Sequence, residues 1–362
     1  MPDSDIAKHD KNMATKNVEE NNLTWKNGYE EPFLLIGFKW FKKDHLYRRL
    51  PVDNEGKIPE SVNELANCTA GGQIRFQTDS KKIVVRVEIS NTNGMVHMAR
   101  TGLSGCDLYV GDPGKERFYD VTKYDSSKTN YEIVLFEDDV KELRSFVINF
   151  PLYKGVKKFE VGLVPESTIK KPLPFAQEGP IVVYGTSITQ GGCASRPGMS
   201  HLNIISRNLN MEIVNLGFSG SGRGEPIMAE LISEIEKPSM IILEYESNAG
   251  FEGTKNTLEK LLTILRDKFE KLPILICTKI CYAKEINNAG LVKDRTGSLE
   301  WQKNIVKQRV DSGDENLYLL DGSTLIGPDD FEATVDGVHP TDLGFNLMAQ
   351  GMIPKIKSIL SL

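Results

Sequence analysis

The stretch Ile181-Val182-Val183-Tyr184-Gly185-Thr186-Ser187-Ile188-Thr189-Gln190-Gly191-Gly192 determines how the second half of the chain folds. Its four leading apolar residues predict a short buried strand over 181–184. The Gly-Thr-Ser that follows predicts a turn into a helix, which presents the Ser187 hydroxyl at the edge of a sheet. The Ser187 N–H then lies near a helix N-terminus, where developing negative charge is stabilised. Taken alone, the stretch fits a helix-capping serine equally well.

Strand and helix patterns alternate from this stretch to the C-terminus. Further apolar strands are expected at 212–216, 240–244, 273–277 and 317–320, and helices at 199–209, 225–236, 257–269, 299–310 and 342–360. Five apolar strands that alternate with helices predict a parallel five-stranded sheet covered by helices on both faces.

The first half of the chain has a different pattern. Short β-rich runs separated by turn residues occur at 72–77, 83–89, 107–110, 132–136 and 145–150, and a weak helical pattern occurs at 61–67. Such runs predict an antiparallel, jelly-roll-like β-sandwich. Three prolines mark a linker at 170–180. We therefore divide the chain into a disordered tail (1–22), a β-sandwich domain (23–169), the linker and an α/β domain (181–362).

Composition excludes several classes of function. The formal net charge is −6, whereas nucleic acid and anionic membrane surfaces attract basic proteins. Five scattered cysteines indicate free thiols in a reducing compartment, and residues 1–22 lack an apolar signal core, so we expect a cytoplasmic protein. A secreted form whose signal was removed stays open. No Cys or His cluster has zinc spacing, so we expect no metal and no cofactor.

Two further predicted strands are followed by groups that can donate hydrogen bonds. The glycine-rich run 217–224 lets backbone N–H groups approach a ligand, although it lacks the spacing of a dinucleotide or Walker loop. Asn248 follows the next strand and can donate its amide N–H to an oxyanion. A flexible loop and an ordinary turn asparagine are the alternatives.

An acid-base pair precedes the last helix, in Asp336-Gly337-Val338-His339-Pro340. A catalytic histidine needs a carboxylate that fixes its tautomer and stabilises its imidazolium. Asp336 can curl back to supply one. The alternative is an Asp-Gly turn that starts the helix.

Together these blocks resemble the SGNH (GDSL-like) hydrolase superfamily over residues 180–362. The matching blocks are Gly185-Thr186-Ser187, Asn215 to Gly220, Asn248 and Asp336-x-x-His339-Pro340. The resemblance implies a three-layer α/β/α sandwich and a triad of Ser187, His339 and Asp336. It also implies an oxyanion hole formed by the Ser187 N–H, the Gly220 N–H and the Asn248 side chain. The N-terminal β-sandwich is similar to that of two-domain acyl-esterases and carbohydrate deacetylases.

Two departures from the family pattern concern the substrate more than the chemistry. Thr186 stands where the family has aspartate, and Glu246-Ser247-Asn248-Ala249 replaces Gly-x-Asn-Asp. We expect a carboxylic ester hydrolase that acts on a small acyl ester, with acylated carbohydrate as the leading substrate. His97, in the irregular run 94–102, and Arg223 are candidate substrate-binding residues. An acyltransferase with the same triad and an inactive binding protein are alternatives, and the oligomeric state is open.

Overall fold

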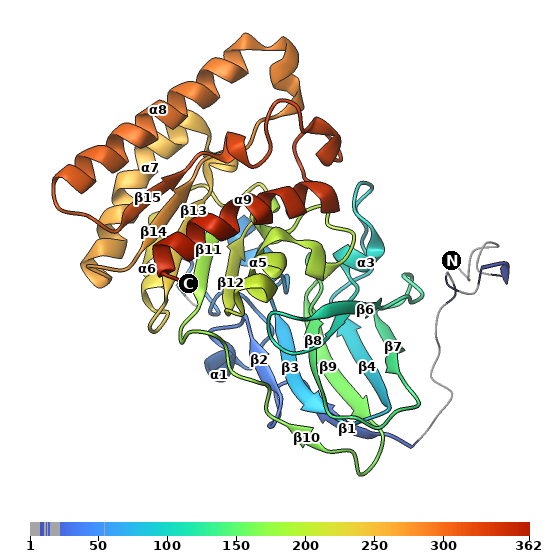
Figure 1. Ribbon diagram of the computed structural model, residues 1–362. Helices are drawn as coiled ribbons and strands as arrows, with labels where there is room; N and C mark the ends of the chain where they lie inside the picture. Colours follow the sequence, from blue (N-terminus) through green and yellow to red (C-terminus); the bar gives the residue numbers. More distant parts are fainter. Residues whose placement is uncertain (1–7, 11, 13, 15–21, 54) are drawn as a thin grey trace. The chain divides into compact units, whose positions relative to one another are not determined.

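A computed structural model describes residues 8–10, 12, 14, 22–53 and 55–362 of the chain (Figure 1). The described residues form two compact units. Unit 1 holds the residues up to Arg49, together with Asn67–Phe175 and Ser195–Gly198. Unit 2 holds Leu50–Ala66, Ala176–Ala194 and Met199–Leu362. Most of the predicted tail, residues 1–22, lies outside the described residues.

The chain does not divide at one point, as the predicted linker at 170–180 implied, because each unit contains separate segments of the sequence. Leu50–Ala66, which the sequence placed in the β-sandwich segment, belongs to unit 2, and Ser195–Gly198 belongs to unit 1. Both segments are short, and their membership depends on contacts with residues far away in the chain. Local patterns do not report such contacts.

A buried carboxylate holds the segment Ser195–Gly198 in unit 1. The Asp107 side chain is fully buried. It accepts hydrogen bonds from Asn149 Nδ2 (2.7 Å), Arg196 Nη1 (3.0 Å) and the Gly198 N–H (2.8 Å). Because a buried charge is costly unless it is paired and hydrogen-bonded, these contacts fix the segment firmly.

Unit 1 consists of two antiparallel sheets with the strand orders β1-β9-β4-β7 and β10-β3-β8-β5-β6, and β2 pairs with β3. The strands are β1 (Thr24–Asn27), β2 (Leu34–Ile36), β3 (Gln73–Thr78), β4 (Lys82–Ile89), β5 (Asp107–Val110), β6 (Arg117–Val121), β7 (Asn130–Glu137), β8 (Arg144–Asn149), β9 (Val156–Leu163) and β10 (Ile169–Lys170). Two short helices, α1 (Phe41–Asp44) and α3 (Arg100–Leu103), lie in the connections.

The two sheets of unit 1 share one core. In β4, Val85, Val87 and Ile89 are nearly fully buried, and they belong to the same apolar cluster as Ile74 of β3 and Ile148 of β8. Alternate residues of a strand point to the same face, so these three side chains lie on the face of β4 that packs against the other sheet. The predicted β-sandwich is confirmed.

Unit 2 is built on a parallel sheet with the strand order β12-β11-β13-β14-β15. The strands are β11 (Ile181–Gly185), β12 (Ile213–Gly217), β13 (Met240–Glu244), β14 (Ile274–Cys277) and β15 (Leu317–Leu320). Every residue of the first four is buried, as strands covered on both faces require. The predicted five-stranded parallel sheet is confirmed.

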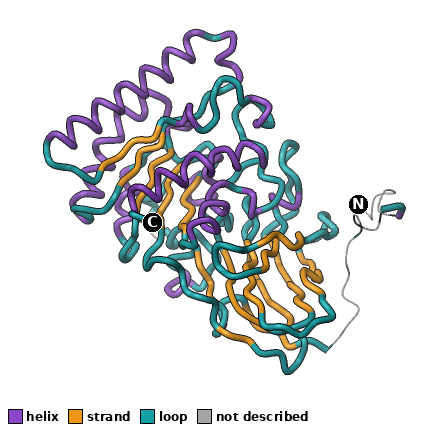
Figure 2. The backbone as a smooth tube through the Cα atoms, viewed as in Figure 1, coloured by secondary structure: helices purple, strands orange, loops and turns teal. Residues whose placement is uncertain are grey.

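Helices cover both faces of this sheet. The helices of unit 2 are α2 (Glu60–Leu65), α4 (Ser187–Gln190), α5 (His201–Leu209), α6 (Pro226–Ser233), α7 (Glu246–Lys268), α8 (Ala289–Asp311) and α9 (Asp342–Leu360). Helices α5 and α9 pack together in front of the strands in Figure 1. Because crossovers between parallel strands are right-handed, α6, α7 and α8 cover the opposite face. Strands dominate unit 1, whereas strands and helices alternate in unit 2 (Figure 2).

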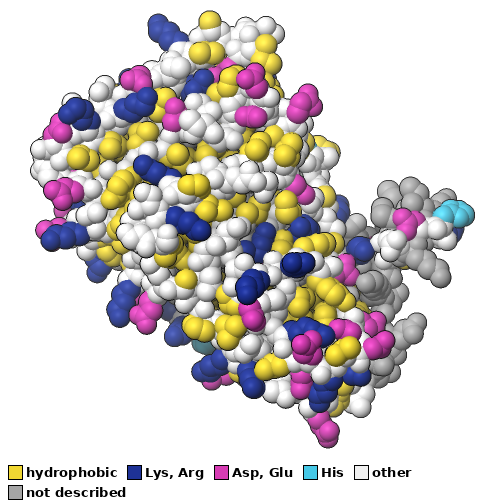
Figure 3. All heavy atoms as spheres, in the orientation of Figure 1, with side chains coloured by type: hydrophobic (Ala, Val, Ile, Leu, Met, Phe, Trp, Pro, Cys, Tyr) yellow, Lys and Arg dark blue, Asp and Glu magenta, His cyan; other side chains and the backbone are white. Residues whose placement is uncertain are grey.

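The surface carries charges of both signs. On the face drawn in Figure 3, Lys and Arg side chains are interspersed with Asp and Glu. Among the described helices, none combines the length and the apolar character that a membrane span needs.

Candidate active site

The strand order of unit 2 reverses at β11, which lies between β12 and β13. Open α/β sheets bind ligands at the carboxyl ends of the strands beside such a reversal. Ser187 follows β11, Gly220 follows β12 and Asn248 follows β13, while Asp336 and His339 lie just before α9. The topology therefore directs residues from four separate parts of the sequence toward one edge of the sheet.

Three of these side chains form a continuous hydrogen-bonded chain. Ser187 Oγ lies 2.9 Å from His339 Nε2, and His339 Nδ1 lies 2.8 Å from Asp336 Oδ2. Ser187 is 8% exposed, whereas the side chains of His339 and Asp336 are 24% and 39% exposed. In this geometry the ring can accept the hydroxyl proton while the carboxylate holds the Nδ1–H. The structure thus brings together the three residues that the sequence singled out.

Local structure fixes the nucleophile turn. Thr186 caps α4: its hydroxyl accepts a hydrogen bond from the Ile188 N–H (3.3 Å), and its own N–H donates to Thr189 Oγ1 (3.0 Å). This reciprocal capping suits a β-region residue directly before a helix. A Cβ at position 185 would lie 2.0 Å from Thr189 Oγ1, so the turn requires Gly185. Threonine in place of the expected aspartate therefore has a structural role in the turn.

The turn before α9 orients the carboxylate of Asp336. Its Oδ1 accepts hydrogen bonds from the N–H groups of Val338 (3.0 Å) and His339 (2.8 Å), while Oδ2 faces the ring. Partial burial on its own would raise the pKa of the Asp336 carboxyl. The hydrogen bonds from His339 and Val338 outweigh burial and hold this pKa below its ordinary value. The carboxylate is therefore ionised at neutral pH.

Two further groups can serve as oxyanion donors. Gly220 has a φ of +67°, which favours glycine, and among the described residues its N–H has no backbone hydrogen-bond acceptor. The neighbouring Ser219 N–H donates to Gln190 Oε1 (3.1 Å), which ties this loop to the nucleophile helix. Asn248 lies in the first turn of α7, and its Nδ2 donates one hydrogen to the Phe218 carbonyl (3.2 Å). Its second amide hydrogen is available for a ligand.

The two candidate substrate-binding residues lie in different units. Arg223 is exposed in unit 2, and its Nε donates to the Gly220 carbonyl (3.2 Å), so it borders the glycine loop. His97 lies half-buried in a turn of unit 1. Both assignments stay predictions.

A buried carboxylate that the sequence analysis missed supports the nucleophile turn. Glu244, the last residue of β13, accepts a hydrogen bond from Thr189 Oγ1 (2.9 Å). His201 Nε2 lies 3.3 Å from the same carboxylate. Asn215 Nδ2 donates to the Thr189 carbonyl (2.8 Å) from the neighbouring strand. The feature of the sequence that could have identified Glu244 is its position as an acidic residue at the end of the apolar run 240–243.

Cys193 is a second side chain that could act as a nucleophile, and it lies close to His339. Its Sγ lies within 4.8 Å of a ring nitrogen of His339. Burial, with a smaller effect from Asp336, raises the pKa of the Cys193 thiol to about 12. Since the thiolate is the reactive form, Cys193 does not compete with Ser187 at neutral pH.

Two family models match the chain. Residues 178–357 match the GDSL-like lipase/acylhydrolase family, and residues 23–169 match a family described as the N-terminus of SGNH-hydrolase-type esterases. The second family is named after a Gly-x-Asp-Leu-Tyr motif, which reads Gly105-Cys106-Asp107-Leu108-Tyr109 in this chain. Its aspartate is the buried Asp107 that holds the segment Ser195–Gly198. A comparison with curated proteins gave no significant match.

Solved structures share the two-part architecture. A protein assigned as a GDSL-like lipase from Bacteroides ovatus is 29% identical, with a TM-score of 0.85 over 94% of this chain and 98% of that chain. A salicylyl-acyltransferase from a tetracycline biosynthetic pathway is 18% identical, with a TM-score of 0.74 and the same coverage. A family two carbohydrate esterase from Clostridium thermocellum, in complex with cellohexaose, is 16% identical, with a TM-score of 0.56 over 81% of this chain and 93% of that chain. The similarity to the acyltransferase and to the carbohydrate esterase shows only that the fold is shared.

The two family matches cover the β-sandwich and the α/β unit separately and in the same order as the sequence predicted them. The chain therefore belongs to the GDSL-like lipase/acylhydrolase family of SGNH hydrolases, in the two-domain form with an N-terminal β-sandwich.

Proposed function

We propose that this protein is a serine esterase that hydrolyses a small acyl ester, above all an acetyl ester, through a Ser187-His339-Asp336 triad. The observation that carries the proposal is the hydrogen-bonded chain from Ser187 Oγ through the His339 ring to Asp336 Oδ2. Membership of a hydrolase family supports the same class of chemistry. A catalytically inactive binding protein would have no need of this alignment.

Acylation starts with attack of Ser187 Oγ on the ester carbonyl carbon while His339 Nε2 accepts the hydroxyl proton. The Asp336 carboxylate holds the Nδ1–H and stabilises the imidazolium that forms. When the tetrahedral intermediate collapses, the carbon–oxygen bond to the alcohol breaks. His339 returns the proton to the leaving alkoxide, so an alcohol departs and an acyl-serine remains.

Deacylation repeats the sequence with water. His339 takes a proton from water as its oxygen attacks the acyl carbonyl. The second tetrahedral intermediate breaks the bond to Ser187 Oγ, which regains the proton from His339. Water thus supplies a hydroxyl to the acid and a proton to the serine, and the enzyme returns to its starting state.

The active serine can be tested directly with a fluorophosphonate probe. We expect labelling of Ser187, detected by mass spectrometry of the modified peptide, and turnover of acyl esters in a substrate panel. A protein that hydrolyses none of the panel and is not labelled at Ser187 contradicts the proposed function.

Substitution of Asn248 tests whether its side chain belongs to the oxyanion hole. Replacement by alanine is expected to lower kcat by about 10²–10³, the usual effect of one lost donor. KM should change little, because the hydrogen bond to the oxyanion strengthens mainly in the transition state. Steady-state kinetics of the purified Asn248→Ala variant measures both constants.

The matched control for Asn248 is Asn208→Ala on α5. Asn208 Nδ2 also donates to a backbone carbonyl, that of Ile204 at 2.9 Å, but it lies away from the strand ends. Both variants lose a similar hydrogen bond, and only Asn248→Ala should lose rate. A destabilised Asn248→Ala variant with normal kcat would assign Asn248 to the turn rather than to the oxyanion hole.

Removal of metal should leave the activity unchanged. In the proposed mechanism the base, the nucleophile and the oxyanion donors all belong to the chain itself. Ester hydrolysis after exhaustive EDTA treatment should therefore equal that of the untreated protein. Loss of activity that one particular metal restores would contradict the mechanism.

Acyl transfer is the alternative that a specific observation favours. A structural neighbour with a TM-score of 0.74 is named a salicylyl-acyltransferase. Transfer uses the same acyl-serine and replaces water by an alcohol. Partition of the acyl group between water and added alcohols distinguishes the two reactions: an esterase releases mainly free acid, and a transferase mainly the new ester.

An acylated carbohydrate is the substrate class that we propose. One neighbour is a carbohydrate esterase solved with cellohexaose, and the family model of the α/β unit covers lipases and acylhydrolases. Arg223 donates a hydrogen bond to the Gly220 carbonyl, which supports the proposal that it contacts the substrate at the glycine loop. Comparison of acetylated sugars with simple acetyl esters at equal leaving-group pKa tests this choice.

A further inference from the structure

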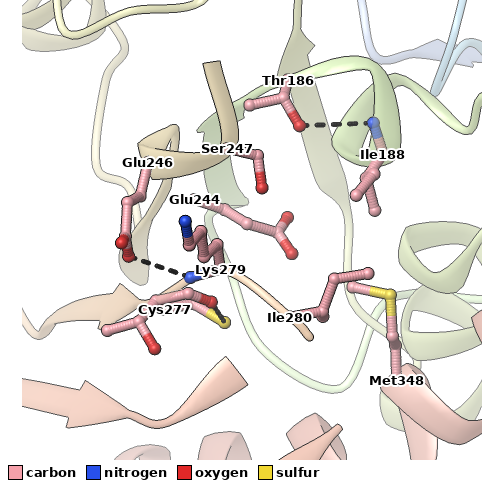
Figure 4. Close-up of a pocket in the computed structure, with 10 residues that line it drawn as sticks. Thr186, Ile188, Glu244, Glu246, Ser247, Cys277, Lys279, Ile280 and Met348 are labelled. Carbon is pink, nitrogen blue, oxygen red and sulfur yellow. Dashed lines mark hydrogen bonds between the residues drawn. The ribbon is translucent and has the colours of Figure 1, made fainter. Parts of the chain in front are cut away.

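The residues that follow β14 contact the start of α7, where Asn248 lies. We call residues 279–285 the bridging segment. The Lys279 N–H donates to Glu246 Oε2 (3.0 Å), a bond drawn in Figure 4. Gln302 Nε2 of α8 donates to the same Glu246 oxygen at 3.0 Å. The Lys279 contact therefore holds Glu246, which lies two residues before Asn248.

The same segment contacts the acid-base turn on its other side. The Ala283 N–H donates to the Gly337 carbonyl at 2.9 Å. Gly337 has a φ of +83°, and a Cβ on it would lie 2.8 Å from the Ala283 Cβ. The turn therefore approaches Ala283 as closely as glycine allows. Gly337 is the neighbour of Asp336, so Ala283 contacts the turn that carries the carboxylate.

A buried ion pair anchors the segment. Glu285 Oε1 accepts a hydrogen bond from the Tyr282 N–H (3.1 Å), and Glu285 Oε2 accepts one from Arg295 Nε of α8 (2.8 Å). The side chains of Arg295 and Glu285 are only 13% and 6% exposed. Charge-assisted bonds of this kind are short and directional. The ion pair therefore sets the position of Tyr282 relative to α8.

We infer that the bridging segment aligns the oxyanion donor with the acid-base pair, and that Glu285, which anchors the segment, is a positioning residue for the reaction at Ser187. The inference rests on the proposed function and adds one positioning residue to it. Lys279 contacts the start of α7 through Glu246, and Ala283 contacts the turn of Asp336 through Gly337. The competing view is that the ion pair only stabilises the packing of α8.

Misalignment by about 1 Å can cost about 100-fold in rate, even when the mutated group is far from the chemistry. Glu285→Ala removes both hydrogen bonds of the anchor and should lower kcat about 10–100-fold with KM nearly unchanged. Glu285→Gln keeps an oxygen for the Tyr282 N–H, so it should recover part of the loss.

The experiment measures kcat, KM, melting temperature and the fraction of protein labelled by a fluorophosphonate for the two Glu285 variants. The control is Asp311→Asn, which removes an exposed ion pair with Lys307 on the same helix α8. Normalising kcat to labelled protein removes the effect of any unfolded fraction. The expected order of kcat is wild type and Asp311→Asn first, then Glu285→Gln, then Glu285→Ala.

A folded Glu285→Ala variant with wild-type kcat overturns the inference, as does a loss that appears only in KM or only in melting temperature. If Glu285→Ala does not fold, Glu285→Gln decides: a lower kcat at constant KM supports the inference, and a wild-type kcat overturns it. A wild-type protein without esterase activity and without labelling at Ser187 overturns the proposed function itself, and the inference with it.

Discussion

Ser187→Ala is expected to reduce ester hydrolysis by about 10⁶-fold in kcat, which is the effect of removing the nucleophile from comparable triads. Alanine has no oxygen to form the acyl-enzyme, so the covalent route is lost. The remaining donors can still polarise a bound ester, and a residual rate of about 10³–10⁴ over that in water is expected. Hydrolysis of a good ester substrate and labelling by a fluorophosphonate measure the loss.

The fold should tolerate this substitution. Ser187 stands in the first turn of α4, where Thr186 supplies the cap and Gly185 the close approach. The melting temperature and circular dichroism of Ser187→Ala should therefore match those of the wild type. Ser312→Ala, at the exposed end of α8, is the control for a lost serine hydroxyl. Turnover of Ser187→Ala near the wild-type rate would exclude Ser187 as the nucleophile.

Much of unit 2 could be predicted because its elements have simple patterns. The strands over 240–244 and 317–320 and the helix over 342–360 have the predicted bounds. Helices α7 and α8 start 11 and 10 residues earlier than expected, at Glu246 and Ala289 instead of 257 and 299. Gly250, with φ +67° and ψ 179°, interrupts the helical backbone of α7, so the pattern before it resembles a turn. The added turns of α8 are exposed or half-buried except at Ser298 and show no apolar stripe.

Unit 1 was harder to predict strand by strand. Strand β9 (Val156–Leu163) lies between β1 and β4 in its sheet, yet the sequence analysis did not identify it. Its Lys157 and Lys158 are exposed neighbours, which breaks the alternation of apolar and polar residues. The class of fold did not depend on this strand, because the other runs and turns already indicated an antiparallel sandwich.

The candidate site shows a similar limit. Ser187, Asn248 and the Asp336/His339 pair could be named because each follows a strand or precedes a helix, and the family resemblance added Gly220. Their supporting contacts could not, because they join residues far apart in sequence, as Thr189 and Glu244 are. The bridging segment is another case, since nothing local in Lys279 or Glu285 indicates a role near Asn248. Sequence patterns locate chemically active groups better than they locate the residues that hold those groups in place.

Asp336→Asn should lower kcat by about 10⁴-fold while leaving the turn intact. The amide oxygen can still accept the N–H groups of Val338 and His339, which now bond to Oδ1. The amide nitrogen then faces His339 Nδ1 and donates to it, which favours the tautomer that carries its proton on Nε2. That tautomer cannot accept the Ser187 proton, and the imidazolium has no counter-charge. Kinetics and the rate of fluorophosphonate labelling should fall together, with KM little changed.

The same variant provides a pH test whose sign follows from the lowered pKa of Asp336. A carboxyl with a lower pKa in the folded than in the unfolded protein stabilises the fold above its unfolded pKa of about 3.9, and this contribution is lost as the pH falls. The melting temperature of Asp336→Asn should therefore decline less between pH 6 and pH 3 than that of the wild type or of Asp329→Asn, a change at an exposed aspartate. Equal declines in all three proteins would mean that Asp336 is not held ionised by its turn. A kcat within tenfold of the wild type would show that His339 does not need this carboxylate, and the acid-base pair would then reduce to the histidine alone.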